Sequence, residues 1–590
     1  MVSEEKNLES QPFEHTESSS PVPVAVTTTL NDNQDNTNYK GPLFVGSIAG
    51  ATLGLVAGTA SFGFQASLLA VINDDLGPSD NYYWLSLVFT LTLAVCCTLI
   101  GRVTDLFGRR YFVVGSYAVA TVGSLVASRA GSIDTLIGAN VLMGVGAVAQ
   151  QSHGFVVGEL VPQKHRVLAV NLMYAATLPT TAFAPAVAWA WVLHTKAGWR
   201  WCFYFTIILN AISCALMLLF YHPPTFHMKS NRNRGEVIRH FDWIGLALFS
   251  GGLITFLLGL SWGGSAYPWK SARVIATLVV GGATLIIFVI FECMAPLQVP
   301  LIPMRLFRKT GFVANVLSLS LCASCYYAFQ ILWPQIVSGI YTTDKSYASV
   351  LYCASSASYT LGILAASLSR YIGRQKWQVV TVSTIATALL GGLACLTTDN
   401  KSTMLGLLIP GLTLIAYAEG VGGATTSLTI DDQAEIGTAV GVALSMRSLI
   451  STVALTIYLT VLQNRLKHTV PEEVVPVLLK AGLPESSISL FIGAITSGSF
   501  SKVPGATAQI VQAGIVAYRR ALVLAFRSVL YTVLAFLLLN ILVSLLFPNL
   551  DHMMNDSVAA RLHDPRNPDT PRAKPSTDHG TITREENAAH

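Results

Sequence analysis

Residues 101–110 of this chain read GRVTDLFGRR, and they separate two long apolar runs. A related stretch, ASLSRYIGRQ, stands 265 positions further along, at residues 366–375, again between two apolar runs. Gly108 and Arg109 have a glycine and an arginine as counterparts there, whereas Asp105 is replaced by arginine. This internal repeat indicates that the chain contains two related halves.

Apolar stretches of membrane-spanning length surround both segments. A helix needs about 20 apolar residues to cross the bilayer. The stretches are continuously apolar, whereas barrel strands would alternate over about ten residues, so we predict helices. The fourteen predicted helices cover 43–70, 83–101, 111–128, 135–157, 167–192, 201–221, 243–262, 273–296, 311–338, 346–369, 377–396, 403–427, 436–462 and 522–547.

The composition supports a membrane protein. Of the 590 residues, 52% are hydrophobic and 12% are charged, whereas a soluble domain carries about a quarter charged residues. The net charge of +5 is small, and no basic face for nucleic acid is expected. The nine cysteines lie in or beside apolar runs, so they are interpreted as packing residues and not as a disulfide frame or metal site.

The predicted architecture is all-α, with two six-helix halves around an inserted helix pair. If both termini are cytoplasmic, the inside loops hold fifteen Lys and Arg residues and the short outside loops hold seven, as the positive-inside rule requires. The predicted regions are a disordered tail (1–42), the N-terminal half (43–221), a linker with helices 7 and 8 (222–310), the C-terminal half (311–547) with a long outer loop (463–521), and a second disordered tail (548–590).

Several function classes are unsupported by any motif. The chain has no phosphate loop of the G-x-x-x-x-G-K-[ST] type, no paired-His metal motif, no nucleophile elbow and no cofactor loop. No enzyme, cofactor or metal is therefore expected. Repeated halves within a helical membrane protein are typical of secondary transporters.

At this point the residues carry a family resemblance. GRVTDLFGRR resembles the signature of the major facilitator superfamily between helices 2 and 3. Fourteen helices with a long outer loop before the last resemble the fungal drug:proton and siderophore transporter branches. Residues 136–205, which contain LIGANVLMGVGAVAQQSHGF and FAPAVAWAWVLHTKAGWRWCFYF, look like the fungal trichothecene efflux pump family. The resemblance implies export of a fungal metabolite driven by the proton gradient.

Departures from the superfamily pattern concern proton coupling. Asn140 stands where members often carry an arginine in helix 4. The helix 5 pattern G-P-x-x-G-G retains only its kinking proline, Pro185, and helix 1 lacks the aspartate that is common in fourteen-helix antiporters. The standard coupling residues are therefore missing, and others must be sought.

The signature segment has a physical interpretation of its own. Asp105 and Arg109 are four residues apart and can pair on one helical turn, while Gly101 and Gly108 permit close backbone approach. We predict that this motif, with Arg110, braces the halves in one conformation and releases them in the other. The alternative is that its arginines are only topology anchors.

Ionisable groups at membrane depth are candidates for proton coupling because burying a charge there is costly. Glu419 and Arg447, both in the C-terminal half, are the leading candidates, with a fixed buried ion pair as the alternative. His153 and Glu159 come next, although packing or capping roles are the simpler interpretation for both. Two further charges in apolar helices are Glu292, expected to snorkel to the interface, and Arg527.

Substrate contacts are expected from aromatic and amide side chains. Tyr326, Tyr327 and Gln330 lie together in helix 9, and Trp333 beyond them is assigned to the interfacial aromatic belt. Other candidates for the cavity are Asn140, Gln150 and Pro185 in the first half, and Asn400 begins a glycosylation acceptor pattern.

The sequence therefore predicts a secondary transporter that exports a moderately apolar organic compound, such as a mycotoxin, another secondary metabolite or a xenobiotic. Its partners would be that compound, protons and the lipid bilayer, with no nucleic acid, and the protein would be a monomer. The plasma membrane is expected, with the vacuolar membrane as the alternative. A siderophore-type importer is the rival within the same fold; a membrane receptor or integral membrane enzyme without transport is the rival from another class.

Overall fold

A computed structural model describes most of the chain between residues 41 and 547. The described ranges are 41–77, 79, 84–107, 109–161, 163–222, 242–264, 267–295, 300–302, 304–429, 436–497 and 503–547. Gly108, almost all of both expected tails, and the side chains of 98–107, 158–159 and 163–167 lie outside what is described.

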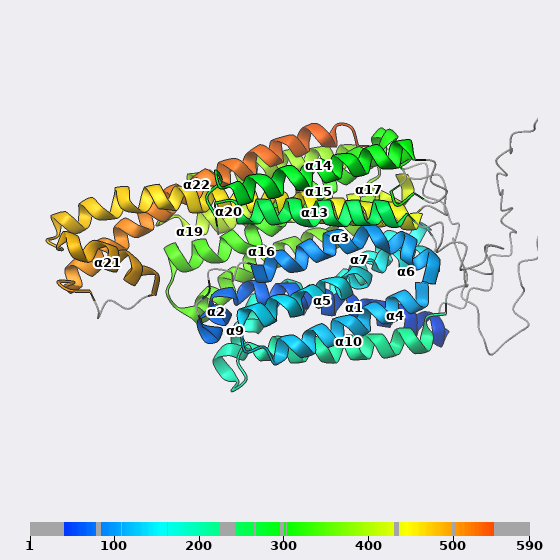
Figure 1. The fold of residues 1–590 in the computed structure, drawn as a ribbon, viewed down its shortest axis with the longest axis horizontal. Helices are drawn as coiled ribbons and strands as arrows, with labels where there is room; N and C mark the ends of the chain where they lie inside the picture. Colours follow the sequence, from blue (N-terminus) through cyan, green and yellow to red (C-terminus); the bar gives the residue numbers. More distant parts are fainter. Residues whose placement is uncertain are drawn as a thin grey trace, which may run out of the picture. The chain divides into compact units, whose positions relative to one another are not determined.

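The described residues form helices and no β-strand, apart from an isolated bridge between Gly263 and Tyr267 (Figure 1). The first half contains α1 (Pro42–Ser67), α2 (Leu69–Leu76), α3 (Trp84–Phe107), α4 (Arg109–Ser128), α5 (Ile133–Gln151), α6 (His153–Leu160), α7 (Gln163–Ala176), α8 (Leu178–Thr181), α9 (Ala184–His194) and α10 (Arg200–Phe220).

Two helices lie between the halves, α13 (Trp243–Trp262) and α14 (Ala272–Met294). The second half contains α15 (Thr310–Ile336), α16 (Lys345–Ala365), α17 (Ser369–Ile372), α18 (Gln375–Gly391), α19 (Lys401–Thr425), α20 (Ile436–Lys480), α21 (Glu485–Ser497) and α22 (Ala508–Ser544). Short 3-10 segments cover Met304–Arg308, Ala366–Leu368, Gly392–Cys395 and Thr426–Thr429, and a π-helical turn covers Val337–Tyr341.

Twelve helices among the described residues are long and apolar enough to cross a membrane. The all-helical, multi-pass membrane prediction is therefore confirmed in its coarse form. Two expected spans, 83–101 and 167–192, are not among these twelve. The count of fourteen stays a prediction.

The second of these spans is broken into three pieces, α7, α8 and α9. Pro179 and Pro185 each stand in the first turn of a new piece, where the missing N–H of proline costs no helical hydrogen bond. The Thr181 hydroxyl lies 2.9 Å from the Thr360 hydroxyl on α16, and so joins the two halves.

The most extensive contacts between the two halves form two interfaces. α3 packs on α20, and the series α7, α8 and α9 packs on α16. A hydrogen bond from the Ser445 hydroxyl to the Ala94 carbonyl, 2.7 Å long, fastens α20 to α3. These seams place helices of both halves around the centre of the molecule.

Within the C-terminal half, α16 and α19 approach closely at a glycine. A Cβ on Gly362 would lie 2.1 Å from the carbonyl oxygen of Thr413, so no larger residue fits there without a shift. Small residues at such crossings let membrane helices pack through their backbones. The close approach brings Tyr359 of α16 next to Glu419 of α19.

The inserted pair packs at one side of the α3–α20 seam. Phe249 of α13 and Phe288 of α14 are buried in a cluster shared with α3, α15 and α20. On the opposite face of α14, the side chains of Val279, Ile286 and Ile290 are not covered by other described residues of the protein. A helix with mean hydropathy 2.7 and such a face is suited to lipid.

The expected outer loop agrees only in part with the prediction. We expected a helix to end near 462, with short separate helices before 522. One such short helix is present as α21, but α20 continues to Lys480 and α22 starts at Ala508 (Figure 1). Val470, Val474 and Leu478 recur every fourth residue and pack in a separate buried cluster with residues of α21 and α22, which explains the continuation.

Candidate functional site

The central feature of the C-terminal half is a buried ion pair between Glu419 on α19 and Arg447 on α20. Nη2 of Arg447 lies 2.7 Å from Oε1 of Glu419, and Nε donates to the same oxygen at 2.8 Å. Their side chains are 15% exposed for Arg447 and 4% for Glu419. Oε2 of Glu419 has no hydrogen-bond partner among the described residues. One carboxylate oxygen is thus saturated and the other is free.

Two tyrosines complete the surroundings of the pair. The hydroxyl of Tyr359 donates to Oε1 of Glu419 at 2.9 Å and accepts from Nη2 of Arg447 at 3.4 Å. The hydroxyl of Tyr327 accepts from Nη1 at 3.4 Å, and its ring centroid lies 5.6 Å from the guanidinium carbon. We call Glu419, Arg447, Tyr327 and Tyr359 the polar cluster.

Aromatic contacts connect the polar cluster to the other half. Tyr326 stacks on Tyr359 with ring centroids 3.8 Å apart, and Phe62 of α1 meets Tyr327 edge-on at 5.5 Å. Tyr174 of α7 packs with Tyr326 and Tyr359 around Ile363 and Ala416. The aromatic contacts therefore join the polar cluster to helices of both halves.

The chemistry of this arrangement follows from its burial. Two charges removed from water are tolerable only when they are paired and hydrogen-bonded, and loss of either charge leaves the other uncompensated. A proton arriving on the free Oε2 would neutralise Glu419 and release Arg447 from its counter-charge.

His153, the second predicted coupling residue, lies on the other side of Tyr174. Its ring meets the Tyr174 ring edge-on at 5.2 Å, it is 5% exposed, and no hydrogen bond to its Nδ1 is found within the described chain. The structure thus places it beside the aromatic contacts and not against Glu419. The side chain of Glu159 lies outside the described residues.

The signature segment is described only in part. The backbone places Gly101 and Asp105 in the last turns of α3, while Gly108 and the Asp105 side chain are not described. Arg109 starts α4. Nη2 of Arg110 donates to the carbonyl of Leu218 at 2.5 Å, near the C-terminus of α10, where a cation is favourable.

The predicted cavity residues separate into two groups. Tyr326, Tyr327 and Gln330 share α15, and Nε2 of Gln330 donates to the Ser356 hydroxyl of α16 at 3.1 Å. Gln150, in contrast, donates to Asn210 of α10, inside the N-terminal half.

The other two first-half candidates have local roles. Asn140 is fully buried and donates to the Leu136 carbonyl one turn back in α5. Pro185 stands in the first turn of α9, after the break in the helix. The structure shows no contact between either residue and the polar cluster.

Two assignments from the sequence were wrong. Trp333 does not belong to an interfacial belt: it is 2% exposed and donates from Nε1 to the Leu351 carbonyl at 2.8 Å. Glu292 does not snorkel: it is buried, and its Oε1 accepts from the backbone N–H groups of Leu301 and Ile302. Both errors have one cause, since residue type in an apolar run does not reveal which way a side chain points.

Arg527 and Asn400 have local partners. Nε and Nη2 of Arg527 both donate to the Leu396 carbonyl, at 2.9 and 2.7 Å. The Asn400 side chain accepts from the Thr397 N–H and donates to the Cys395 carbonyl, just before α19. Arg527 therefore closes a helix end, and glycosylation of Asn400 stays a prediction.

Tyr359 and Tyr174 were missed by the sequence reasoning. Both phenols stand within apolar helices, in SSASYTLG and NLMYAATL. A buried tyrosine hydroxyl needs a hydrogen-bond partner, and this requirement was the available signal for Tyr359.

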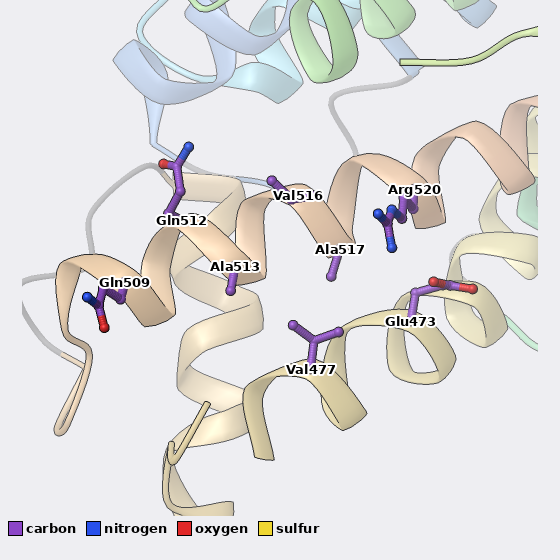
Figure 2. A pocket seen from close by; sticks show the side chains of 8 residues that line it. All are labelled: Glu473, Val477, Gln509, Gln512, Ala513, Val516, Ala517 and Arg520. Carbon is purple, nitrogen blue, oxygen red and sulfur yellow. The ribbon is translucent and has the colours of Figure 1, made fainter. Parts of the chain in front are cut away.

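A groove of about 470 Å³ lies away from the polar cluster, between the extended ends of α20 and α22. Figure 2 shows Glu473 and Arg520 at one end of it and Gln509 at the other. The groove has no contact with the ion pair in the structure, so it does not belong to the candidate site.

Comparison with known proteins agrees with this architecture. The family model described as fungal trichothecene efflux pump (TRI12) matches residues 1–580. The trichothecene efflux pump TRI12 of Fusarium sporotrichioides is 29% identical over 541 residues, covering 90% of each chain. Its namesake in Trichoderma arundinaceum is 29% identical over 550 residues, again covering 90% of each.

A solved structure shares the fold. It is that of a bacterial homologue of the human lysosomal transporter Spinster, in an inward-facing and unoccupied conformation. The TM-score is 0.50 and the identity 16%, with 87% of this chain and 98% of that chain covered. The relatives are transporters and not enzymes.

Proposed function

The chain belongs to the fungal trichothecene efflux pump family, and from this premise we propose that it exports a moderately apolar organic compound in exchange for protons, with Glu419 as the proton-carrying group. The substrate would be a mycotoxin or another secondary metabolite, or a xenobiotic. The protein would act as a monomer in the plasma membrane, with the vacuolar membrane as the alternative.

The observation that carries the proposal is the unequal use of the two Glu419 oxygens. Oε1 receives hydrogen bonds from Arg447 and Tyr359, whereas Oε2 is buried without a partner. Burial penalises the charged form of a carboxylate, so such a group either stays paired with a cation or takes up a proton. The free oxygen is where that proton would bind.

Arg447 would reset the carrier. While Glu419 is charged, the ion pair links the side chains of α19 and α20. When Glu419 is protonated, the guanidinium loses its counter-charge and its best hydrogen-bond acceptor, so the contacts within the polar cluster change. The aromatic contacts with α1 and α7 would carry that change to the seams between the halves.

The substrate would bind next to the polar cluster. Tyr326, Tyr327 and Phe62 offer ring faces and edges from both halves. Gln330, one turn beyond Tyr326, offers amide groups that are shared with Ser356. Rings with a few polar groups suit a terpenoid or polyketide better than a sugar or phosphate.

Asp105 and Arg109 would serve as the cytoplasmic brace. Their positions at the end of α3 and the start of α4 lie on the helix pair that contacts both α5 and α20. Gly101, Gly108 and Arg110 complete this segment. The brace is proposed from the spacing of the sequence and from the family resemblance.

The test is export into sealed vesicles with and without an imposed pH gradient. Glu419→Gln keeps the shape and hydrogen bonding of the side chain but fixes its charge at zero. We expect substrate exchange at equilibrium to persist, while gradient-driven accumulation falls by about 5-fold or more. A factor of about 5 corresponds to the lower end of typical coupling free energies between two sites. Substrate binding should also lose its pH dependence, because linkage between proton and substrate is reciprocal.

The control is Glu292→Gln, which alters a buried carboxylate that binds backbone N–H groups elsewhere. It reports the effect of losing any buried charge. If Glu419→Gln accumulates substrate as the unmodified protein does, the coupling role moves to His153 or Glu159.

A further inference from the structure

The surroundings of the Arg447 guanidinium have the composition of an organic-cation site. A carboxylate oxygen lies 2.7 Å from it, a tyrosine ring faces it at 5.6 Å, and two phenolic oxygens accept from it at 3.4 Å. Proteins that bind ammonium and guanidinium ligands combine aromatic faces with a negative charge. Here the cation comes from the chain itself.

Arg447 is held in this position by its own helix. Ser445, two residues earlier, donates to the Ala94 carbonyl of α3 and fixes α20 at this level. Behind the guanidinium, Tyr326 stacks on Tyr359 and Phe62 meets Tyr327, so the cage walls are packed by both halves. The Arg447 guanidinium is therefore surrounded by side chains that are themselves packed by both halves.

We propose that Arg447 is a specificity-determining residue: it occupies an organic-cation cage formed by Glu419, Tyr327 and Tyr359 and so keeps cationic compounds out of the central site. The consequence for substrate choice rests on the proposed export function.

The charges of the polar cluster determine whether charged or uncharged compounds would bind next to it. The described charges at the site are Glu419 and Arg447, which sum to zero. Because these charges cancel, a cation or an anion would lose its hydration there and meet no net counter-charge in a medium of low dielectric. The intact cluster therefore selects an uncharged compound. Without the guanidinium, the remaining carboxylate and rings would attract a cation.

The test is to empty the cage and refill it with a small ligand. Arg447→Ala removes the guanidinium while leaving Glu419 and both tyrosines. Ethylguanidinium chloride replaces the missing group, and N-ethylurea is the uncharged probe of similar shape. Thermal unfolding of the purified variant should shift upward by about 2 °C or more, in a saturable manner, with ethylguanidinium and not with N-ethylurea.

The matched control is the double variant Glu419→Gln with Arg447→Ala, which has the same space without the carboxylate. Neither it nor the unmodified protein should be stabilised by ethylguanidinium. If Arg447→Ala does not fold alone, Arg447→Gln takes its place in the same titration. No shift in the single variant, or an equal shift in the double variant, would overturn the proposal.

This binding measurement is independent of export. Saturable stabilisation together with failure of gradient-driven export in vesicles would support the cage and contradict the proposed function. Export that proceeds as proposed, without ethylguanidinium binding to the emptied cage, would contradict the cage alone.

Discussion

Two ion pairs of the molecule show how far burial changes the meaning of the same contact. Asp75 and Arg200, in the N-terminal half, lie 3.1 Å apart with side chains that are 50% and 32% exposed. Glu419 and Arg447, in the C-terminal half, lie 2.7 Å apart with side chains 4% and 15% exposed. Water competes for the first pair and screens it. The second pair has no such competitor, so its protonation state matters to the packing around it.

The largest expected effect comes from breaking the buried pair on one side. Arg447→Gln leaves the Glu419 carboxylate without its counter-charge, and we expect a loss of about 3–5 kcal/mol of stability. Chemical denaturation in detergent measures the loss. The double variant with Glu419→Gln should be more stable than this single variant, because no uncompensated charge remains. A double variant that is less stable than the single one would show that the pair is not coupled as described.

The next effect concerns a charge at the C-terminal end of α3. Asp105→Asn should reduce export several-fold while membrane insertion and surface abundance stay unchanged, because the brace between the halves is weakened. Transport in cells, normalised to surface protein, measures it. Normal transport at normal abundance would remove the gating role and leave the arginines of the segment as topology anchors.

A buried hydrogen bond between two uncharged side chains can be compared with the two ion pairs. Gln150 donates to Asn210 between α5 and α10, where both are buried. Asn210→Ala should cost about 1–3 kcal/mol, since the buried amide of Gln150 loses its acceptor while no charge is left uncompensated. Its pH dependence of stability should match that of the unmodified protein. A new pH dependence would mean that the N-terminal half also contains a titrating partner for this contact.

The smallest effect is expected at the exposed pair. The indole of Trp199, with a further contribution from Arg200, holds the pKa of Asp75 below its ordinary value. Because the pKa is lower in the folded protein, the contact stabilises at neutral pH, and this contribution fades as the pH falls below about 4.

Asp75→Asn should therefore cost a few tenths of a kcal/mol at neutral pH and nothing in acid. Unfolding midpoints at neutral and acidic pH measure the difference. An equal cost at both pH values would show that Trp199 and Arg200 do not favour the ionised form of Asp75 in the folded protein.

The fold could be predicted from the sequence because lipid imposes one simple rule, a continuous apolar run. That rule says nothing of where an amphipathic helix continues outside the membrane. The extension of α20 beyond 462 follows instead from Val470, Val474 and Leu478, whose spacing of four is a weaker signal. Likewise the break at Pro179 and Pro185 could be expected, but the hydroxyl contact of Thr181 with the opposite half could not.

The two charged residues of the candidate site could be predicted from the sequence, whereas the tyrosine that contacts them could not. Glu419 and Arg447 stand out because ionised groups in apolar helices are rare. Tyr359 does not stand out, since tyrosine is common in such helices, and its contact with Glu419 depends on the close approach of α16 and α19 at Gly362. Side-chain direction decided the errors at Trp333 and Glu292, and a linear sequence does not contain it.

α20 continues as one helix through Pro471 and Pro476, and its length makes it a lever arm. Arg447 lies about a quarter of the way along it, and Lys480 lies at most about 50 Å further on at 1.5 Å per residue. A tilt of about 10° at the ion pair would therefore displace the far end by roughly 9 Å, along with the α21 and α22 segments packed on it. A fluorophore attached at position 512, in place of Gln512, would report this movement in single molecules. A small change at Glu419 would then be followed through the larger displacement at the far end of α20.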